Sequence, residues 1–306
     1  MQGVILRGVG GFYYVRSGER IFECKARGVF KKQGITPLAG DRVELSELSE
    51  YTGSDLPGGG SYPVGVVEEI LPRLNSFDRP PAANVELMVL VIAAKHPQPS
   101  PRTIDSFCVA AEKAHTELLI CVNKCDLAEK EELEELRKIY DGLYPMVFVS
   151  ARLAEQGDIK GSGLEDLRAA TLGKQIAFAG PSGVGKSSLI NLLLGGELSE
   201  VGDISKKNLR GKNTTRHTEL FEASDMRIFD TPGFTSFEAM GIEEEELDML
   251  FPEMRGLKGQ CFYSDCRHLK EPDCAVRLGV REGRIQRSRY ESYKALIQEI
   301  RENRKY

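Results

Sequence analysis

Hydrophobic and polar positions follow a strand-like pattern up to about residue 72 of the 306-residue chain. Short apolar or alternating runs are separated there by Gly, Ser and Asp, which favour turns. These runs predict strands at 3–6, 12–15, 21–26, 42–45 and 64–70. Five short strands in this length favour a small all-β barrel of the OB type. OB barrels often bind nucleic acid, so the barrel's basic and aromatic residues are candidates for such a face, or the aromatic residues belong to its core.

After a proline-containing linker at 71–81, strand-like and helix-like patterns alternate. The predicted strands are 85–94, 117–123, 146–150, 175–179 and 226–230. The predicted helices are 103–115, 128–140, 164–172, 188–194 and, near the C-terminus, 286–304. Alternation of this kind predicts an α/β domain with a mostly parallel sheet, whose ligands bind at the C-terminal ends of the strands. We therefore expect a barrel at 1–72, an α/β domain at 73–238 and a small C-terminal domain at 239–306.

The composition is that of an ordinary soluble globular protein. The longest apolar run, 85–94, is too short to cross a bilayer, and the N-terminus does not resemble a signal peptide. An odd number of cysteines, seven, argues against a disulfide framework. These features predict a cytoplasmic protein with no membrane partner, and a monomer is the simplest expectation.

The net charge of −5 hides two basic ends. Residues 1–45 carry eight Lys or Arg against four Asp or Glu, and residues 251–306 carry thirteen against eight. An acidic chain usually disfavours nucleic-acid binding, but local basic patches at both ends remain compatible with it.

The clearest chemical motif follows the predicted strand 175–179. It fits G-x-x-x-x-G-K-[ST], the phosphate-binding loop of nucleoside triphosphatases. Glycines let the backbone wrap around phosphates, and the N-terminus of the following helix adds positive potential. Lys186 is expected to reach the β- and γ-phosphates, and the Ser187 hydroxyl to bind Mg²⁺. The predicted nucleotide contacts of this loop are Gly180, Pro181, Ser182, Gly183, Val184, Gly185, Lys186, Ser187 and Ser188.

Two further motifs at strand ends favour guanine over adenine. Asn123, Lys124 and Asp126 fit the N-K-x-D motif of GTPases. The Asp126 carboxylate can accept hydrogen bonds from both the N1–H and the amino group of guanine, a pair that adenine does not offer. Ser150 and Ala151 resemble the S-A element, whose backbone N–H contacts guanine O6. Each motif alone could be an ordinary polar turn, but together with the phosphate-binding loop they predict a GTPase.

Two switch motifs are expected to complete the site. Asp230 and Gly233 fit D-x-x-G, in which the aspartate holds Mg²⁺ through water and the glycine N–H contacts the γ-phosphate. Thr215, preferred over Thr214, is the expected switch threonine, so Ser187 and Thr215 are the predicted magnesium ligands. Lys186 and Thr215 are the predicted catalytic residues.

The order of the motifs indicates a circular permutation. Ordinary GTPases place the phosphate-binding loop first, whereas here N-K-x-D and S-A precede it by dozens of residues. Such a rearrangement keeps the site when the natural termini lie close together. It also ties the segment after residue 238 directly to the switch that senses the γ-phosphate.

The C-terminal segment carries a candidate metal site. The spacing C-x4-C-x-H-x5-C is formed by Cys261, Cys266, His268 and Cys274. A Cys₃His set is a closed tetrahedral zinc set, which leaves no position for a catalytic water and therefore predicts one structural Zn²⁺. The alternative is that these are small buried cysteines and an unrelated histidine.

A barrel, a permuted GTPase domain with N-K-x-D, G-P-S-G-V-G-K-S and D-T-P-G-F strings, and a Cys₃His segment together resemble the ribosome small-subunit-dependent GTPase A family of bacteria. The resemblance covers nearly the whole chain. It implies a GTP hydrolase, binding GTP and GDP, that acts as a late assembly factor of the small ribosomal subunit and is stimulated by it. It also implies that the barrel and the zinc domain contact rRNA.

The sequence does not single out one residue that positions the attacking water. Phe234 follows D-T-P-G, where many GTPases place a glutamine that orients water. The family often carries a histidine just before its Thr-Thr pair, but Asn213 occupies that position and the nearest histidine is His217. Both are candidates. Two other functions are alternatives: a GTP-gated RNA-binding scaffold, and a permuted GTPase that acts on the large subunit.

Overall fold

The computed structural model of the chain describes residues 1–52, 62–78, 80–195, 218–223, 226–230 and 241–303. The contacts within the chain define two compact units, each built from segments that are distant in sequence. The first unit is Met1–Leu87, Thr171–Phe178 and Ile190–Phe234. The second unit is Met88–Ala170, Ala179–Leu189 and Thr235–Tyr306. Among the described helices, none combines the length and apolarity that crossing a bilayer requires.

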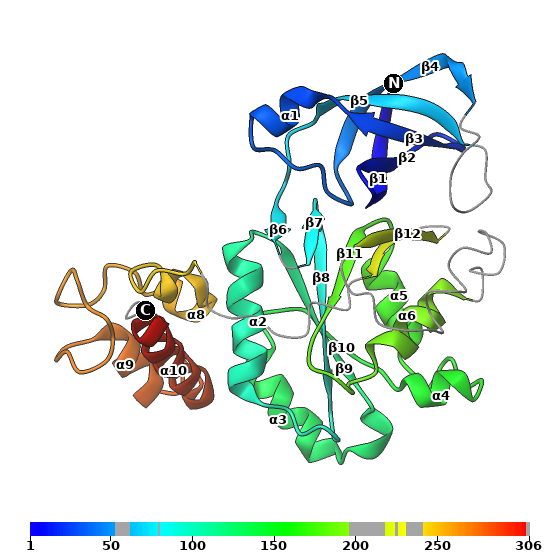
Figure 1. The fold of residues 1–306 in the computed structure, drawn as a ribbon. Coiled ribbons are helices and arrows are strands. Elements are labelled where there is room, and N and C mark those ends of the chain that lie inside the picture. Colours follow the sequence, from blue (N-terminus) through cyan, green and yellow to red (C-terminus); the bar gives the residue numbers. More distant parts are fainter. Residues whose placement is uncertain (53–61, 79, 196–217, 224–225, 231–240, 304–306) are drawn as a thin grey trace. The chain divides into compact units, whose positions relative to one another are not determined.

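The predicted barrel is confirmed in the first unit (Figure 1). Its strands are β1 (Gln2–Val9), β2 (Phe12–Ser17), β3 (Arg20–Ala26), β4 (Arg42–Thr52) and β5 (Pro63–Ile70), with helix α1 (Gly28–Lys32) after β3. β1 pairs antiparallel with β2 and β4, and β3 pairs parallel with β5, which closes the barrel through β4. Phe30 of α1 and inward-pointing side chains of the strands form the core, the latter being Ile5, Val15, Phe22, Cys24, Val43, Leu45 and Val67.

The barrel's aromatic residues divide between the core and the surface. Tyr13 is half-buried against the barrel core. Phe12 and Tyr14 are also half-buried, but each lies under a cation: Lys25 Nζ is 5.1 Å from the centre of the Phe12 ring, and the Arg7 guanidinium is 4.6 Å from that of Tyr14. The barrel's aromatic residues are therefore neither all part of the core nor all available on one surface face.

The rest of the first unit continues the sheet from the barrel. Antiparallel strand β12 (Glu219–Ala223) pairs with β1 on one side and with β13 (Met226–Asp230) on the other. β13 in turn pairs parallel with β11 (Gln175–Ala179). A small hairpin of β6 (Ser76–Asp78) and β7 (Pro81–Ala83) occupies the second half of the predicted linker and extends two residues beyond it.

The second unit contains the other strands of the predicted α/β domain. β8 (Leu87–Ala93), β9 (Glu117–Asn123) and β10 (Met146–Phe148) are neighbours in the order β10-β9-β8, and β9 and β10 are parallel. Every residue of β8 is buried, as expected for a strand covered on both faces. The helices are α2 (Pro101–Lys113), α3 (Lys130–Tyr140), α4 (Ala151–Glu155), α5 (Leu164–Thr171) and α6 (Lys186–Leu194), with a short 3₁₀ turn η1 (Cys125–Leu127) after β9.

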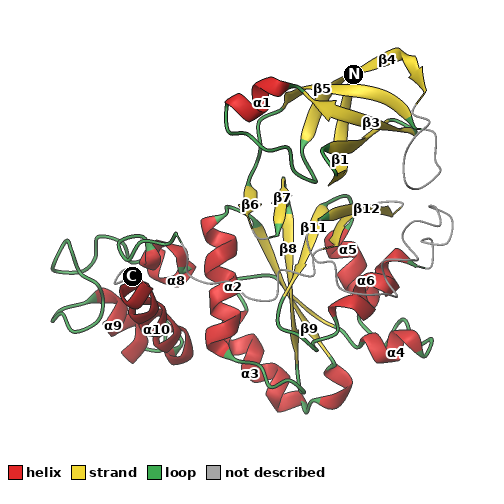
Figure 2. Cartoon of the chain, viewed as in Figure 1, coloured by secondary structure: helices red, strands yellow, loops and turns green. Residues whose placement is uncertain are grey.

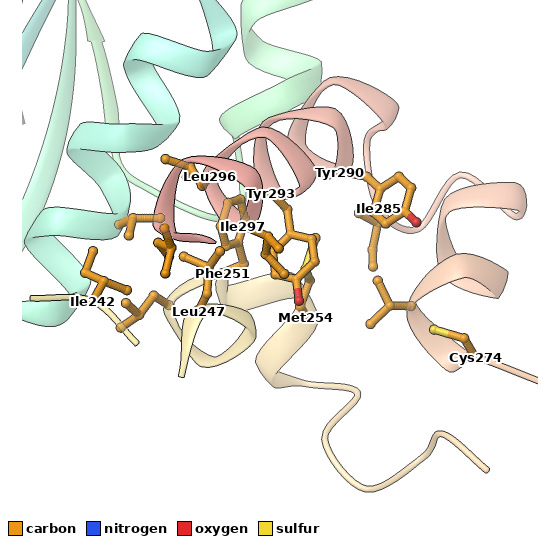
Figure 3. Close-up of a cluster of buried hydrophobic side chains, with 14 residues drawn as sticks. Ile242, Leu247, Phe251, Met254, Cys274, Ile285, Tyr290, Tyr293, Leu296 and Ile297 are labelled. Carbon is orange, nitrogen blue, oxygen red and sulfur yellow. The ribbon is translucent and has the colours of Figure 1, made fainter. Parts of the chain in front are cut away.

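The C-terminal part of the second unit is built from helices and loops in its described residues (Figure 2). It contains η3 (Leu247–Leu250), α8 (Pro252–Arg255), α9 (Ala275–Arg281) and α10 (Arg287–Asn303), and α10 confirms the predicted C-terminal helix. Side chains of α10 meet those of η3 and α8 in a hydrophobic cluster, where the Phe251 and Tyr293 rings pack edge to face at 5.6 Å (Figure 3). We call residues 241–303 the C-terminal subdomain.

Candidate nucleotide-binding site and metal centre

The phosphate-binding loop joins β11 to α6, and its glycines are required by their surroundings. Gly180 has φ +131°, and a Cβ atom there would overlap the carbonyl oxygen of Val91 in β8. Gly185 has φ +97°, and a Cβ atom there would overlap the side-chain amide of Asn123. Both glycines thus combine a left-handed backbone with a close approach, which no other residue accommodates without strain.

Two residues of the N-K-x-D motif hold this loop in place. Asn123 at the end of β9 donates from Nδ2 to the Val184 carbonyl at 2.8 Å. Lys124, which adopts a left-handed conformation (φ 61°), donates from Nζ to the Gly183 carbonyl at 2.7 Å and also to the His96 carbonyl. The end of β9 is therefore tied directly to the loop, although about sixty residues separate them in sequence.

The other face of the motif meets the S-A element. Ser150 Oγ donates to Asp126 Oδ1 at 2.6 Å, and the Arg152 guanidinium lies 3.5 Å from Oδ2. Ser150 Oγ also accepts a hydrogen bond from the Leu153 N–H and so caps α4. The Ala151 N–H donates to Asn123 Oδ1 at 3.0 Å, so guanine O6 would compete with an amide oxygen for this donor. The carboxylate of Asp126 is thus held in one orientation by its neighbours.

Lys186 turns back onto its own loop. Its ammonium donates to the carbonyls of Gly180 at 2.6 Å and Pro181 at 2.7 Å. Burial lowers the pKa of this amine, since desolvation disfavours the charged form. A bound phosphate would supply the negative charge that the loop itself lacks.

The predicted switch residues lie largely outside the described residues. Asn213, Thr214, Thr215 and His217 fall in 196–217, and Gly233 and Phe234 fall in 231–240. Asp230 is the last residue of β13, and its backbone pairs with Glu219.

The predicted metal ligands come together in the C-terminal subdomain. The ligand atoms of Cys261, Cys266, His268 and Cys274 all lie within 4.8 Å of one another. His268 presents Nδ1 to the three sulfurs, at 3.5 Å from Cys261, 3.4 Å from Cys266 and 3.3 Å from Cys274. These side chains could hold a metal ion.

Residues that the sequence did not point to support this cluster. The outward nitrogen of His268, Nε2, lies 3.5 Å from Asp248 Oδ2, the arrangement that commonly orients a metal-binding histidine. Two tyrosines of α10 hold the same loop, because Tyr290 donates to the His268 carbonyl at 2.6 Å and Tyr293 to the Arg267 carbonyl at 3.1 Å. The sequence predicted the helix that carries them, but nothing in it indicated where the hydroxyl groups would bind.

A phosphate-binding loop held by an N-K-x-D turn that precedes it in the chain defines a circularly permuted P-loop GTPase. The family model described as RsgA GTPase matches residues 70–240, and the one described as RsgA N-terminal domain matches residues 2–54. The chain belongs to the RsgA GTPase family.

Individual relatives match over the full length of the chain. A protein of Alkaliphilus metalliredigens named small ribosomal subunit biogenesis GTPase RsgA is 38% identical over 100% of this chain and 99% of its own length. A protein of the same name from Caldanaerobacter subterraneus is 40% identical over 100% of this chain and 97% of its own. The crystal structure of YjeQ from Thermotoga maritima has a TM-score of 0.79, with 37% identity and 98% of both chains covered. YloQ, described as a circularly permuted GTPase, has a TM-score of 0.77, with 33% identity, 99% of this chain and 95% of its own covered.

Proposed function

We propose that this protein hydrolyses GTP to GDP and phosphate as a late assembly factor of the small ribosomal subunit, and that the subunit stimulates its turnover. The relatives named for small-subunit biogenesis support the cellular role. The observation that carries the enzymatic role is the pair of hydrogen bonds from Asn123 and Lys124 to the phosphate-binding loop. They would make recognition of the base and of the phosphates parts of one rigid site.

Each motif then has a defined task. Asp126, held by Ser150, accepts the guanine N1–H and amino group, and Ala151 contributes its backbone N–H to O6. Lys186 leaves the carbonyls of Gly180 and Pro181 for the β- and γ-phosphates. The backbone N–H groups of the loop and of the first turn of α6 surround the phosphates. The residues that offer these N–H groups are Ser182, Gly183, Val184, Gly185, Ser187 and Ser188, whereas Pro181, which has no N–H, contributes only to the shape of the loop.

The catalytic magnesium would be held by hydroxyl groups from two segments. Ser187, in the first turn of α6, and Thr215 are the proposed ligands, and Asp230 acts through water. The ion would neutralise charge that develops between the β- and γ-phosphates. Gly233 donates its N–H to the γ-phosphate, and Asn213 or His217 positions the attacking water.

The metal of the C-terminal subdomain is proposed to be one structural Zn²⁺. A tetrahedral zinc ion with bonds of about 2.3 Å to sulfur and 2.0–2.1 Å to nitrogen separates its ligands by about 3.6–3.8 Å. The sulfurs of Cys261 and Cys274 lie 3.9 Å apart, and the sulfur–nitrogen distances to His268 are 3.3–3.5 Å. Three thiolates and one imidazole are also the donor set that zinc prefers.

The domain division proposed from the sequence assigns separate roles to 1–72, 73–238 and 239–306. In this proposal the two outer domains, with their basic residues, contact rRNA, and the central domain binds the nucleotide. The protein acts in the cytoplasm as a monomer.

Nucleotide binding offers the most direct test of the site. Lys186→Ala should abolish measurable GTP binding, and Asp126→Asn should shift the preference from guanine to xanthine nucleotides, because its amide can donate to the xanthine oxygen. Titration with fluorescent GDP, XDP and ADP measures both. Equal competition by ATP and GTP for the wild-type protein would contradict the assigned role of Asp126.

Isolated ribosomal subunits test the cellular role. The protein should co-sediment with small subunits in the presence of a non-hydrolysable GTP analogue, and small subunits should raise its turnover. Binding without stimulation would favour the alternative of a GTP-gated RNA-binding scaffold. Co-sedimentation with large subunits instead would favour the other alternative, a GTPase of the large subunit.

A further inference from the structure

Three neighbouring strands of the first unit place a barrel arginine in line with the D-x-x-G aspartate. Arg7 of β1 pairs in register with Glu219 of β12, and Glu219 pairs in register with Asp230 of β13. Adjacent strands lie about 4.8 Å apart, so about 10 Å of paired backbone separates Arg7 from Asp230. We call these three residues the switch row.

A side-chain contact strengthens the first step of the switch row. Arg7 Nη1 lies 2.8 Å from Glu219 Oε1, and these side chains are 19% and 25% exposed. The guanidinium also lies over the Tyr14 ring at 4.6 Å, which restricts the orientations open to it. Arg7 is thus held by its own barrel while it holds β12.

The switch row lies at the end of β12 from which the switch segments leave. β12 begins at Glu219, four residues after Thr215, and β13 ends at Asp230, three residues before Gly233. At the opposite end of the two strands, Ala223 pairs with Met226 where the chain turns back. A change in the position of Glu219 is therefore close to Thr215 in sequence and, through its pairing with Asp230, close to Gly233 in sequence.

A second barrel contact reaches the same end of β13. Gly40, in the loop before β4, has φ +89°, and a Cβ atom there would lie 2.6 Å from the ring of Phe229. Phe229 immediately precedes Asp230. The barrel therefore packs against β13 directly as well as through β12.

A matched ion pair at the far end of β12 provides an internal control. Arg16 Nε of β2 lies 2.9 Å from Glu222 Oε2, with exposures of 26% and 28%. Glu222 pairs in register with Arg227 and contacts its side chain at 3.2 Å. This pair resembles Arg7–Glu219 in length and burial but lies in a row without a switch residue.

We propose that Arg7 is a positioning residue for GTP hydrolysis, which fixes, through Glu219, the strand ends that carry the two switch segments. This inference rests on the proposed function. It gives the barrel a part in catalysis besides binding a partner. A displacement of β1 would act on the paired ends of β12 and β13, at Glu219 and Asp230, without any contact to the nucleotide.

Single-turnover GTP hydrolysis, measured with and without small subunits, tests the proposal. Arg7→Gln should lower the hydrolysis rate roughly three- to tenfold, which lies within the roughly two- to thirtyfold coupling found for residues that contact neither ligand. Its GDP affinity should stay within about twofold of wild type, because the base and phosphate-loop contacts are made by other residues. Arg16→Gln should keep both values within about twofold.

A charge exchange separates positioning from general destabilisation. Arg7→Glu combined with Glu219→Arg restores the ion pair in reverse and should recover most of the lost rate. Hydrogen exchange of the β12 amides should rise in Arg7→Gln and return to the wild-type level in the double variant.

The outcomes distinguish this inference from the proposed function. A wild-type protein that does not hydrolyse GTP, alone or with subunits, would overturn the proposed function. If the wild type is active, equal rates for Arg7→Gln and Arg16→Gln would overturn the positioning role alone. So would a double variant that folds but remains as slow as Arg7→Gln.

Discussion

The barrel and the C-terminal subdomain are attached to their neighbours in different ways. The barrel continues a sheet, because β1 pairs with β12 through backbone hydrogen bonds and partly exposed ion pairs flank the contact. The C-terminal subdomain meets α2 and α3 through side chains, and at the centre lies Arg289 of α10, which is fully buried. Paired backbones fix the alignment of two strands by themselves, whereas contacts between side chains can slide.

A network of buried charges takes the place of backbone pairing at the second junction. Arg289 Nη1 lies 2.7 Å from Asp105 of α2, which is also fully buried, and Nε and Nη2 contact the Glu253 carboxylate at 2.7 and 3.0 Å. The Tyr140 hydroxyl of α3 donates to the same Asp105 oxygen at 3.0 Å. More exposed ion pairs follow α2 on either side: Arg102–Glu299, Glu112–Arg255 and Lys113–Glu246.

Each junction fixes one alignment of its partners, but by a different kind of contact. A buried ion pair is seldom more stabilising than a well-packed apolar pair, but it tolerates only one alignment of its partners. Our hypothesis is that Arg289 selects a unique position for the C-terminal subdomain on α2, as strand register does for the barrel. Substitutions at the two junctions should therefore destabilise different parts of the protein.

Removal of the proposed zinc ion is expected to have the largest effect and to spare the barrel. Structural zinc contributes about 10 kcal/mol or more in small zinc-finger peptides, which exceeds what the hydrogen bonds of Tyr290 and Tyr293 to the loop between α8 and α9 can supply. Chelation, or Cys261→Ser, should expose 256–274 to proteolysis and raise hydrogen exchange in α9 and α10. Cys24→Ala, at a buried barrel cysteine outside the cluster, is the control. Unchanged proteolysis after confirmed metal loss would contradict a structural role.

Arg289→Met should have the next largest effect. It leaves Asp105 and Glu253 with uncompensated charge at a buried site, which typically costs about 3–5 kcal/mol. Arg102→Met, at a pair whose arginine is 56% exposed, should cost about 1 kcal/mol or less. Urea unfolding followed by hydrogen exchange in α10 measures both. Equal losses in the two variants would argue against a special role for the buried charge.

The folding stability of Arg289→Met should also depend on pH, and it should fall as the pH rises. Burial already raises the pKa of Asp105, and loss of Arg289 raises it further. The folded variant then binds a proton that the unfolded chain releases above about pH 4, so its stability falls as the pH rises. The difference in unfolding free energy between wild type and Arg289→Met should therefore become smaller as the pH is lowered from 7 to 5.

Gly40→Ala should have a smaller effect, confined to the barrel junction. The new Cβ atom would overlap the Ala83 carbonyl, and the positive φ adds strain, for an expected cost of about 1–3 kcal/mol. Gly34→Ala is a matched control, since its φ is +69° but no atom would lie within 4 Å of the added carbon. Thermal unfolding should separate the two, and equal melting temperatures would show that the loop moves freely.

Local patterns in the sequence predicted the barrel, the alternating strands and helices, and the metal cluster. The motifs at 123–126, 150–151 and 180–187 depend on spacing within short segments, so they could be recognised before any contact was known. The structure brings the first two together with the loop as expected. The roles assigned to individual nucleotide contacts stay predictions.

The junctions could not be predicted, because they depend on partners that are distant in sequence. Strand β12 has five residues with two glutamates, which is too short and too polar a run to stand out. No motif marked Arg289, and 184 residues separate it from the aspartate that it contacts. Asp248 carried no motif, and its relation to His268 follows from the packing of η3 against α10.

The pairing of β1 with β12 also has a consequence during synthesis. Arg7 and Glu219 are 212 residues apart, so at about 5–20 residues per second the ribosome takes roughly 10–40 s to deliver the partner strand. Until then the outer edge of β1 around Arg7 lacks the neighbour that covers it in the finished protein, and unpaired edges invite other strands. The nascent barrel therefore spends a defined interval with an open edge, which closes only when β12 has been made.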